Sequence, residues 1–446
     1  MADRLVVVGG GAAGMSAASA ARRADPDLAI TVLETSPFPS FGVCGLPYYL
    51  SGVVPEAESL VAHPVAEYRG RRRIDLRLET PVVGLDIDRG LVELPAESLA
   101  FDRLVLASGA RPLVPALPGV DHPRVVSIRR LDDAIALRRI LPDVRRAVVV
   151  GAGYVGLEMA ESLHHRGIDV TVVDRLDRVM VTVDREVAQL AQAEVERHAT
   201  VLLGRTLTAI EPAGTGLRVH TDQGAPLIAD LVVLALGVVP QVDLLREAGA
   251  ETGPGGALLV DDRMRTSLPG VLAAGDCVAV HHRVLDAPAY VPLGPAANKA
   301  GRVAGTVAAG RDARFEGVMG TAVVKVFDLT VAHTGIGTEQ AAAVGIEAVA
   351  TDVTARSRAK YYPGAEPLLV RLVHTPEGRL LGAQLAGRDG AAQRIDVVVA
   401  ALQAGFHVAD LAALDLAYAP PFSPVYDPLT QAAQAALRSR PAVVAL

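Results

Sequence analysis

The chain has 446 residues, which at the usual ~100–200 residues per domain is enough for about three domains, each with its own core. Hydrophobic residues make up 50% of the sequence and aromatic residues 4%, but polar side chains interrupt every apolar run before it reaches the ~18 residues of a membrane span. The net charge is −7, without a long basic run, so we expect neither a membrane nor a nucleic acid as a partner. The apolar start of the chain breaks at once into glycines, which predicts a first buried strand of a cytoplasmic protein rather than a signal peptide.

The first motif is a glycine turn between a strand and a helix. Gly9, Gly11 and Gly14 have the spacing G-x-G-x-x-G after an apolar strand and before an alanine-rich helix, and the next strand, at residues 30–34, ends at Glu34. Glycines at this spacing admit a pyrophosphate to the helix N-terminus, where unpaired N–H groups and the helix dipole hold it, and the carboxylate accepts from the ribose hydroxyls. The segment therefore predicts a dinucleotide-binding unit.

The same pattern occurs a second time. Gly151, Gly153 and Gly156 follow another branched strand, and the strand at residues 170–174 ends at Asp174. Two dinucleotide units in one chain imply two nucleotide cofactors.

The acidic residue of the second unit bears on the choice of nicotinamide cofactor. Asp174 favours NADH over NADPH, because a carboxylate repels a 2′-phosphate. Arg175 and Arg178 follow it closely, so NADPH stays possible.

Three further segments have the pattern of a nucleotide-binding sheet. Strands at residues 104–112 and 231–240 end in small residues and a proline, and a short strand at 270–276 ends in Gly275-Asp276 before a helix that opens after Pro292. The carboxylate of Asp276 can accept from a ribityl hydroxyl of a flavin, while the helix N-terminus can face the O2 region of the isoalloxazine. From Thr321 onward, alternating apolar and polar residues followed by an alanine-rich helix predict an antiparallel sheet covered by helices.

In this order, the two glycine units, the two strand exits and the Gly-Asp segment resemble the pyridine nucleotide-disulfide oxidoreductase family over almost the whole chain. The resemblance implies an α/β fold with two Rossmann-like dinucleotide-binding domains, for FAD and NAD(P)H, and a C-terminal α+β dimerisation domain. We expect the FAD domain at 1–112 and 242–317, the NAD(P)H domain at 113–241 and the dimerisation domain at 318–446.

The resemblance also assigns cofactor-binding residues. Tyr154 is expected to act as a gate that swings away when the nicotinamide stacks on the flavin, and Glu158 is expected to polarise the nicotinamide pocket. The full set of expected cofactor contacts is Gly9, Gly11, Ala12, Ala13, Gly14, Glu34, Val82, Ser108, Gly109, Gly151, Gly153, Tyr154, Val155, Gly156, Glu158, Asp174, Gly237, Gly275, Asp276, Pro292 and Ala296.

The sequence contains two cysteines, Cys44 and Cys277, too few for a disulfide framework, and we expect no metal site. Cys44 precedes Pro47, a residue suited to the first turn of a helix, and the positive end of a helix dipole stabilises a thiolate. A small buried core thiol is the alternative, but Cys44 follows the first β-α-β unit, where disulfide reductases place their redox cysteine. Tyr49 stands where a second redox cysteine would be, and Cys277 is interpreted as packing.

A single redox cysteine narrows the resemblance to coenzyme A-disulfide reductases, NADH oxidases and NADH peroxidases. Ala12 stands where the oxidases and peroxidases usually have a histidine, which disfavours oxygen and peroxide chemistry. Tyr361 and Tyr418 lie in segments that look like the two tyrosine segments of coenzyme A-disulfide reductases, with Tyr362 the less favoured choice for the first. Such segments also shape interface loops without a catalytic role.

Coenzyme A carries three phosphates, which arginine side chains suit. Arg22 ranks first as a phosphate contact, because it lies in the helix whose start the flavin fixes. Alternatively, this arginine lies at a solvated helix end and contacts no phosphate. The same alternative applies to the other candidates, Arg23, Arg69, Arg71, Arg72 and Arg73. The expected substrate contacts are Arg22, Ser40, Phe41 and Asn298.

The sequence therefore predicts a cytoplasmic homodimeric FAD-dependent NAD(P)H:disulfide oxidoreductase, with Cys44, Tyr418 and Tyr361 as catalytic residues and coenzyme A disulfide or a similar small disulfide as substrate. A persulfide or polysulfide reductase is the first alternative, since the same cysteine can attack a sulfane sulfur. NADH oxidase or peroxidase is the second. Two alternatives remain. The protein could be a flavoprotein reductase of a protein electron carrier, or a redox sensor without turnover.

Overall fold

The computed structural model describes residues 3–439, which form two compact units. The first unit comprises the chain up to Pro115, together with Val126–Val144 and Leu236–Val318. The second unit comprises Ala116–Val125, Arg145–Ala235 and the chain from Met319.

The first unit is built on a five-stranded parallel sheet with the strand order β19-β7-β1-β2-β3. β1 and β7 lie in its centre, and each carries a short run of buried branched residues, as parallel sheets covered on both faces require. The strands are β1 (Arg4–Val8), β2 (Ala29–Leu33), β3 (Asp75–Arg77), β7 (Arg103–Leu106) and β19 (Val271–Ala273).

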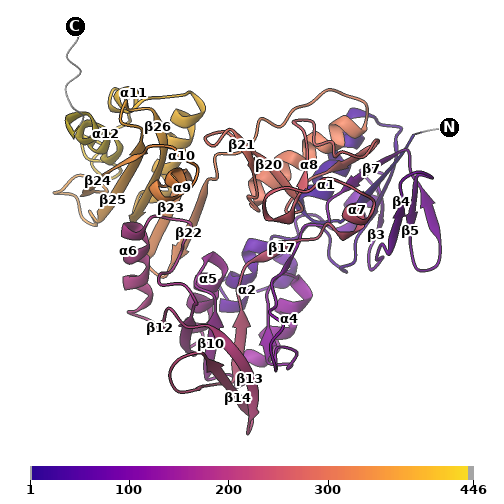
Figure 1. Ribbon diagram of the computed structural model, residues 1–446, viewed down its shortest axis with the longest axis horizontal. Coiled ribbons are helices and arrows are strands. Elements are labelled where there is room, and N and C mark those ends of the chain that lie inside the picture. The colour runs from indigo at the N-terminus through magenta and orange to yellow at the C-terminus, as the bar shows by residue number, and fades with distance from the viewer. Residues whose placement is uncertain (1–2, 440–446) are drawn as a thin grey trace. The chain divides into compact units, whose positions relative to one another are not determined.

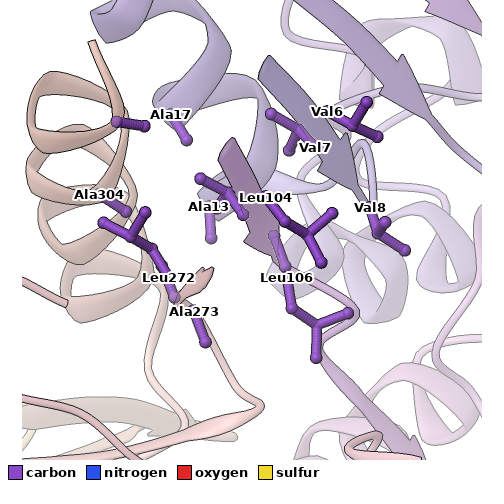
Figure 2. Close-up of a cluster of buried hydrophobic side chains, with 14 of the residues drawn as sticks. Val6, Val7, Val8, Ala13, Ala17, Leu104, Leu106, Leu272, Ala273 and Ala304 are labelled. Carbon is purple, nitrogen blue, oxygen red and sulfur yellow. The ribbon is translucent and has the colours of Figure 1, made fainter. Parts of the chain in front are cut away.

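Two helices, α1 (Ala12–Ala24) and α8 (Gly294–Ala308), pack closely together in this unit. A β-carbon on Gly301 would lie 2.2 Å from the carbonyl oxygen of Ala13, and one on Gly305 would lie 1.9 Å from that of Ala17. Figure 2 shows the small side chains of these helices, Ala13, Ala17 and Ala304, beside the sheet residues of β1, β7 and β19. Glycine and alanine at these positions thus let α8, which is distant in sequence, pack directly on the helix that follows the first glycine turn.

The remaining elements of the first unit are shorter. β4 to β6 form a three-stranded antiparallel sheet, β8 pairs with β17, and β18, β20 and β21 form a third small sheet. The strands are β4 (Gly84–Asp86), β5 (Leu91–Glu93), β6 (Ser98–Ala100), β8 (Ala110–Pro112), β17 (Val238–Pro240), β18 (Leu258–Leu259), β20 (Val278–His282) and β21 (Ala287–Ala289). The helices are α2 (Leu46–Ser51), α3 (Val65–Arg69), α4 (Leu131–Ile140) and α7 (Asp243–Glu247), with 3-10 turns η1 (Val43–Gly45), η2 (Ala57–Leu60), η3 (Leu141–Asp143) and η4 (Pro254–Gly256).

The second unit contains a second parallel sheet, in the order β12-β11-β10-β16, with β9 at its edge. The strands are β9 (Val125–Val126), β10 (Arg146–Val150), β11 (Asp169–Val173), β12 (Thr200–Leu202) and β16 (Leu231–Leu234). Helices α5 (Tyr154–His164) and α6 (Arg185–Val195) belong to this segment, as does an antiparallel sheet of β13 (Leu207–Ala213), β14 (Gly216–Thr221) and β15 (Leu227–Ala229).

The second unit also holds the antiparallel sheet predicted for the C-terminal part, in the order β22-β23-β26-β25-β24. Helices α10 and α12 pack against it, and Figure 1 shows them beside β24 to β26. Its strands are β22 (Ala322–Val326), β23 (Leu329–Gly335), β24 (Val349–Arg356), β25 (Pro367–His374) and β26 (Leu380–Gly387), and its helices are α9 (Thr338–Ala343), α10 (Ala391–Gln403), α11 (Val408–Ala412) and α12 (Pro428–Ser439). The predicted α/β fold with two dinucleotide-binding sheets and a C-terminal α+β part is confirmed.

A buried ion pair joins the second parallel sheet's segment to this antiparallel sheet. Asp184, just before α6, accepts from the Nε of Arg371 on β25 at 2.9 Å, and both side chains are buried. The backbone N–H of Asp184 donates to Gln384 on β26 at 2.8 Å. Because a buried charge without its partner costs several kcal/mol, these residues hold α6 against the sheet.

Residues 126–144 pack within the first unit, although the expected NAD(P)H domain begins at residue 113. Arg129 pairs with Asp276 at 2.5 Å, and Arg138 donates to the carbonyl of Pro55 at 2.7 Å. The compact units of the structure therefore do not coincide with the expected FAD and NAD(P)H domains. The expected domain boundaries stay a prediction.

Candidate functional site

The first glycine turn has the geometry of a pyrophosphate cradle. Gly9 has φ of 104°, and a β-carbon on Gly14 would lie 1.8 Å from the carbonyl oxygen of Gly9, so a side chain at either position is disfavoured. Gly11, at the N-cap of α1, has no heavy atom within 4 Å of the position that a β-carbon would take. The open side of this turn therefore fits a phosphate group at the helix N-terminus.

Glu34 lies directly beside this turn. Its carboxylate accepts from the backbone N–H of Gly10 at 2.5 Å and from that of Ser36 at 2.7 Å. These two bonds fix the carboxylate at the end of β2, where the sequence predicts a ribose contact.

The second glycine turn has the same geometry as the first at each of its three glycines. Gly151 has φ of 111°, a β-carbon on Gly156 would lie 1.8 Å from the carbonyl oxygen of Gly151, and Gly153 faces open space. Asp174 accepts from the backbone N–H of Ala152 at 2.6 Å. The two turns thus offer two equivalent dinucleotide cradles, one in each unit.

The basic side chains beside Asp174 differ in their surroundings. Arg178 is 11% exposed and forms two hydrogen bonds to the carboxylate of Glu339, at 2.7 and 2.5 Å. Arg175 is exposed. The arginine nearer the protein interior is therefore already neutralised by a carboxylate of its own unit.

Several predicted flavin residues of the first unit follow the ends of β7 and β19, namely Ser108, Gly109, Gly275 and Asp276. Gly275 has φ of 93°, and a β-carbon there would lie 2.9 Å from that of Ala13. Ser108 donates to the carbonyl of Gln241 at 2.5 Å, and Asp276 is bound by Arg129, a residue that sequence reasoning missed. Val82 and Ala296 are half-buried against the core, Pro292 precedes α8, and Gly109 and Gly237 adopt φ of 70° and 100°.

Cys44 is exposed and lies in η1, two residues before α2 begins at Leu46. The preceding loop is tied to the first glycine turn, because the N–H of Ser40 donates to the carbonyl of Gly10 at 2.8 Å. Ser40 has φ of 41°, a conformation that costs a non-glycine residue free energy and persists only where surrounding contacts hold it. Phe41 forms a bridge to Val61 on the other side of the loop. The structure therefore brings the thiol loop and the glycine turn together.

Cys277 has a different environment. Its side chain is fully buried, and its Sγ lies 3.3 Å from the carbonyl oxygen of Ala274 and 3.7 Å from that of Leu106. Burial raises the pKa of the Cys277 thiol to about 11, so it stays protonated at neutral pH. The packing role predicted for Cys277 agrees with this burial.

Tyr361 and Tyr418, which are 57 residues apart in sequence, lie side by side in the second unit. Their hydroxyl oxygens are 3.5 Å apart, and the side chains are 76% and 46% exposed. The hydrogen bond to the hydroxyl of Tyr361 raises the pKa of Tyr418 above its ordinary value. Three further exposed apolar side chains that sequence reasoning missed follow in the same C-terminal segment: Phe422, Val425 and Tyr426.

The two predicted substrate contacts that lie on helices, Arg22 and Asn298, already form hydrogen bonds with other residues of the chain. Arg22 donates to the carbonyls of Arg72, Pro26 and Arg73 at 3.0, 2.7 and 2.8 Å, and burial lowers its pKa. Asn298 on α8 accepts from the hydroxyl of Ser16 on α1 at 2.7 Å. Arg22 therefore braces the loop before β3, and a phosphate contact there stays a prediction.

A surface hollow of about 680 Å³ lies at the opposite end of the first parallel sheet, where β7 and β19 begin. Arg103, Arg263, Arg265 and Arg311 line it. None of the predicted site residues borders this hollow, so it is separate from the predicted substrate site.

Among residues 3–439, no helix combines the length and apolar character needed to cross a membrane.

Comparison with known proteins identifies relatives along nearly the whole chain. The family description "Pyridine nucleotide-disulphide oxidoreductase" matches residues 3–309, and the dimerisation domain of the same family matches residues 321–429, which supports a homodimer.

Two curated relatives and one solved structure are informative. The NAD(P)H coenzyme A polysulfide/persulfide reductase of Pyrococcus horikoshii is 37% identical, over 96% of this chain and 97% of its own. Coenzyme A disulfide reductase of Staphylococcus aureus is 30% identical, over 94% and 96%. The structure of an NAD-dependent persulfide reductase from A. fulgidus superposes with a TM-score of 0.95 at 38% identity, covering 98% of this chain and 83% of that one.

Both glycine cradles fit the cofactors of that family, FAD and NAD(P)H. The chain belongs to the pyridine nucleotide-disulphide oxidoreductase family and is an oxidoreductase that uses FAD and NAD(P)H.

Proposed function

We propose that the protein reduces coenzyme A disulfide or a similar small disulfide with NAD(P)H, through Cys44 as its one redox-active thiol. The observation that carries this proposal is the contrast between the two cysteines. Cys44 is exposed in a loop fastened to the first glycine turn, whereas Cys277 is buried and stays protonated. A disulfide exchange needs an accessible thiolate, so only Cys44 suits the reaction.

FAD, when bound, takes up a hydride equivalent from NAD(P)H and releases the electron pair to sulfur. The first glycine turn and Glu34 would hold it, as the open space at Gly11 supports. Asp276 would contact its ribityl chain and Arg129 would orient that carboxylate, since the two side chains are paired at 2.5 Å. The second glycine turn and Asp174 would hold the NAD(P)H.

The thiolate of Cys44 would attack one sulfur of the substrate disulfide. A bond forms between Cys44 and that sulfur, the substrate S–S bond breaks, and the other substrate sulfur leaves as a thiolate. The hydroxyl of Tyr418 would donate a proton or hydrogen bond to this leaving thiolate, with Tyr361 beside it. Two electrons and a proton then reduce the mixed disulfide, which releases the second thiol and restores the Cys44 thiolate.

A persulfide or polysulfide reductase is the second candidate. The relatives named for sulfur, polysulfide or persulfide reduction are 36% to 38% identical to this chain, against 30% for the coenzyme A disulfide reductase of Staphylococcus aureus and 34% for the CoADR-RHD protein of Bacillus anthracis. Cys44 can attack a sulfane sulfur by the same exchange chemistry. Ala12 offers no ring nitrogen at the glycine turn, which weighs against peroxide or oxygen as the acceptor.

Steady-state rates with coenzyme A disulfide, polysulfide, peroxide and oxygen at equal NADH separate these candidates. The highest kcat/KM with coenzyme A disulfide supports the first proposal. A kcat/KM for polysulfide more than tenfold above that for coenzyme A disulfide favours the second candidate, a persulfide or polysulfide reductase.

The first prediction concerns Cys44. Cys44→Ser should retain NADH-driven reduction of an artificial dye and lose disulfide reduction, because the flavin path does not need the thiol. Cys277→Ser is the matched control and should keep disulfide turnover, with stability within about 1 kcal/mol of wild type. Full disulfide turnover by Cys44→Ser refutes the proposal.

The second prediction is a preference for NADH. Asp174 would repel a 2′-phosphate, and Arg178 is already paired with Glu339. We expect kcat/KM for NADH to exceed that for NADPH by about tenfold, and Asp174→Ala to reduce the ratio. A higher value for NADPH in wild type shows that the arginines outweigh the carboxylate.

The third prediction concerns Glu158, whose pKa is raised from 4.5 to about 7 by burial and by the charge of Glu161. The folded protein therefore holds this proton more tightly than the unfolded chain does, and the stability from Glu158 is lost as the pH rises from about 4.5 to 7. The loss should reach about 3 kcal/mol. Calorimetric Tm values at pH 5 and pH 8 measure it.

Between pH 5 and pH 8, the Tm of Glu158→Gln should fall by less than the Tm of wild type. Glu347→Gln, at an exposed position, is the control and should follow wild type. Equal pH slopes for wild type and Glu158→Gln contradict the raised pKa.

The fourth prediction concerns Tyr418 and the dimer. We propose that each active site combines Cys44 of one chain with Tyr418 of the other, since the C-terminal part matches the dimerisation domain. Tyr418→Phe should retain flavin reduction by NADH but slow disulfide turnover about 10²-fold.

Mixing Cys44→Ser and Tyr418→Phe subunits under conditions of exchange tests the shared site. One site of each heterodimer would then carry both defects and the other neither, so disulfide turnover should recover up to one wild-type site per heterodimer. No recovery despite proven exchange shows that each site lies within one chain.

A further inference from the structure

The side chain of Tyr154, the first residue of α5, is held by hydrogen bonds from two different parts of the second unit. Its hydroxyl lies 2.5 Å from the Nε2 of His333 on β23 and accepts from the hydroxyl of Thr182 at 2.8 Å. The Tyr154 and His333 rings are nearly parallel, with an interplanar angle of 14° and centroids 6.2 Å apart. Both ring position and hydroxyl direction are therefore fixed.

The protonation of His333 sets the direction of this chain of bonds. Burial lowers the pKa of His333 to about 4, so the imidazole is neutral at physiological pH and one ring nitrogen is an acceptor. Because Thr182 donates to the Tyr154 oxygen, the Tyr154 O–H is available to donate onward to Nε2 of His333. The order of donation is then Thr182 to Tyr154 to His333.

His333 is itself held rigidly. It lies in the interior of the antiparallel sheet, where β23 pairs with β22 on one side and β26 on the other, opposite Ala322 and Gln384. An acceptor on a central strand cannot follow the tyrosine ring if the ring moves. Movement of Tyr154 must therefore break its bond to His333.

Tyr154 and Glu158 are one turn apart on α5, so their side chains lie on the same face of the helix. Gly153, which faces open space at the helix N-terminus, directly precedes Tyr154. The held ring thus occupies the side of α5 that carries Glu158, where the family resemblance places the nicotinamide end of the dinucleotide proposed to bind the second glycine turn.

We propose that His333 is a positioning residue that latches Tyr154 in the position that obstructs dinucleotide binding. This inference rests on the proposed function for the site of the nicotinamide, but not on the identity of the disulfide substrate. A dinucleotide binds only the unlatched population, so its apparent affinity is reduced by the fraction of protein in that state. One net hydrogen bond shifts such an equilibrium by about fivefold.

The test is a double-mutant cycle on the dissociation constant of NAD⁺, measured by calorimetry on the FAD-loaded oxidised dimer. His333→Ala should bind NAD⁺ about fivefold more tightly than wild type, and Tyr154→Phe at least fivefold more tightly, because it loses the bond from Thr182 as well. The double variant should bind about as tightly as Tyr154→Phe alone, because Tyr154→Phe already removes the bond to His333. In turnover, His333→Ala should lower the KM for NADH about fivefold and leave kcat within about twofold.

Two further variants separate a latch from a general effect of removing a histidine from this sheet. His333→Gln retains a side-chain acceptor and should bind NAD⁺ within about twofold of wild type. His374→Gln removes a buried histidine on β25 of the same sheet that is bonded to Thr351, and should also leave NAD⁺ binding unchanged.

Unchanged or weaker NAD⁺ binding in both His333→Ala and Tyr154→Phe overturns the latch. A gain in the double variant equal to the product of the two single gains also overturns it. Because the calorimetry involves no disulfide, its result can overturn the latch while the proposed reduction through Cys44 stands. Equally, disulfide reduction through Cys44 can fail in the turnover assays while the latch stands.

Discussion

The close approach of backbone to backbone in the two glycine turns is the constraint on which the other features depend. In each turn a helix starts so close to the preceding strand that a β-carbon on the third glycine, Gly14 or Gly156, would lie 1.8 Å from a carbonyl oxygen. This approach aims the N-terminus of α1 or α5 at the space beside the turn and brings Glu34 or Asp174 next to it. The first turn also anchors the Cys44 loop through Ser40, and the second starts α5 at Tyr154. The two dinucleotide cradles, the thiol proposed to react and the tyrosine proposed as a gate therefore share one geometric origin.

The second unit shows how charged residues fasten elements of different type together. Arg371 on β25 is bound by Asp184 and also by Asp352 at 2.7 Å, and Glu161 on α5 accepts from the N–H of Phe327 at 2.9 Å while pairing with Lys325. These contacts secure the helices of the second parallel sheet to the antiparallel sheet. The bond between Tyr154 and His333 belongs to the same set of contacts. Through this bond, as proposed above, a residue of the C-terminal sheet would influence the dinucleotide site without touching the dinucleotide.

Local sequence patterns sufficed for much of this architecture. The strand expected from Leu5 is found as β1, the glycine spacing located both turns, and the position of Cys44 before Pro47 placed it at the start of a short helix. These features depend on residues within about 20 positions of one another, where spacing translates directly into geometry. The family resemblance located Tyr361 and Tyr418, whose adjacency was not visible in either segment alone.

The contacts that were missed join residues far apart in the chain. Arg129 pairs with Asp276 across 147 positions, and Tyr154 meets His333 across 179. No periodicity or spacing rule connects such pairs, because their proximity results from the packing of whole elements. The placement of 126–144 in the first unit has the same origin, since Arg129 and Arg138 bind groups supplied by other segments.

The proposed reaction depends on a covalent bond between Cys44 and half of the substrate. This bond is tested most directly by peptide mass spectrometry after the oxidised protein, without NADH, is incubated with one equivalent of coenzyme A disulfide per subunit. We predict a mixed disulfide of one coenzyme A thiol on Cys44, removed by subsequent NADH, and no modification of Cys277. Turnover of coenzyme A disulfide by protein in which Cys44 stays unmodified would contradict it.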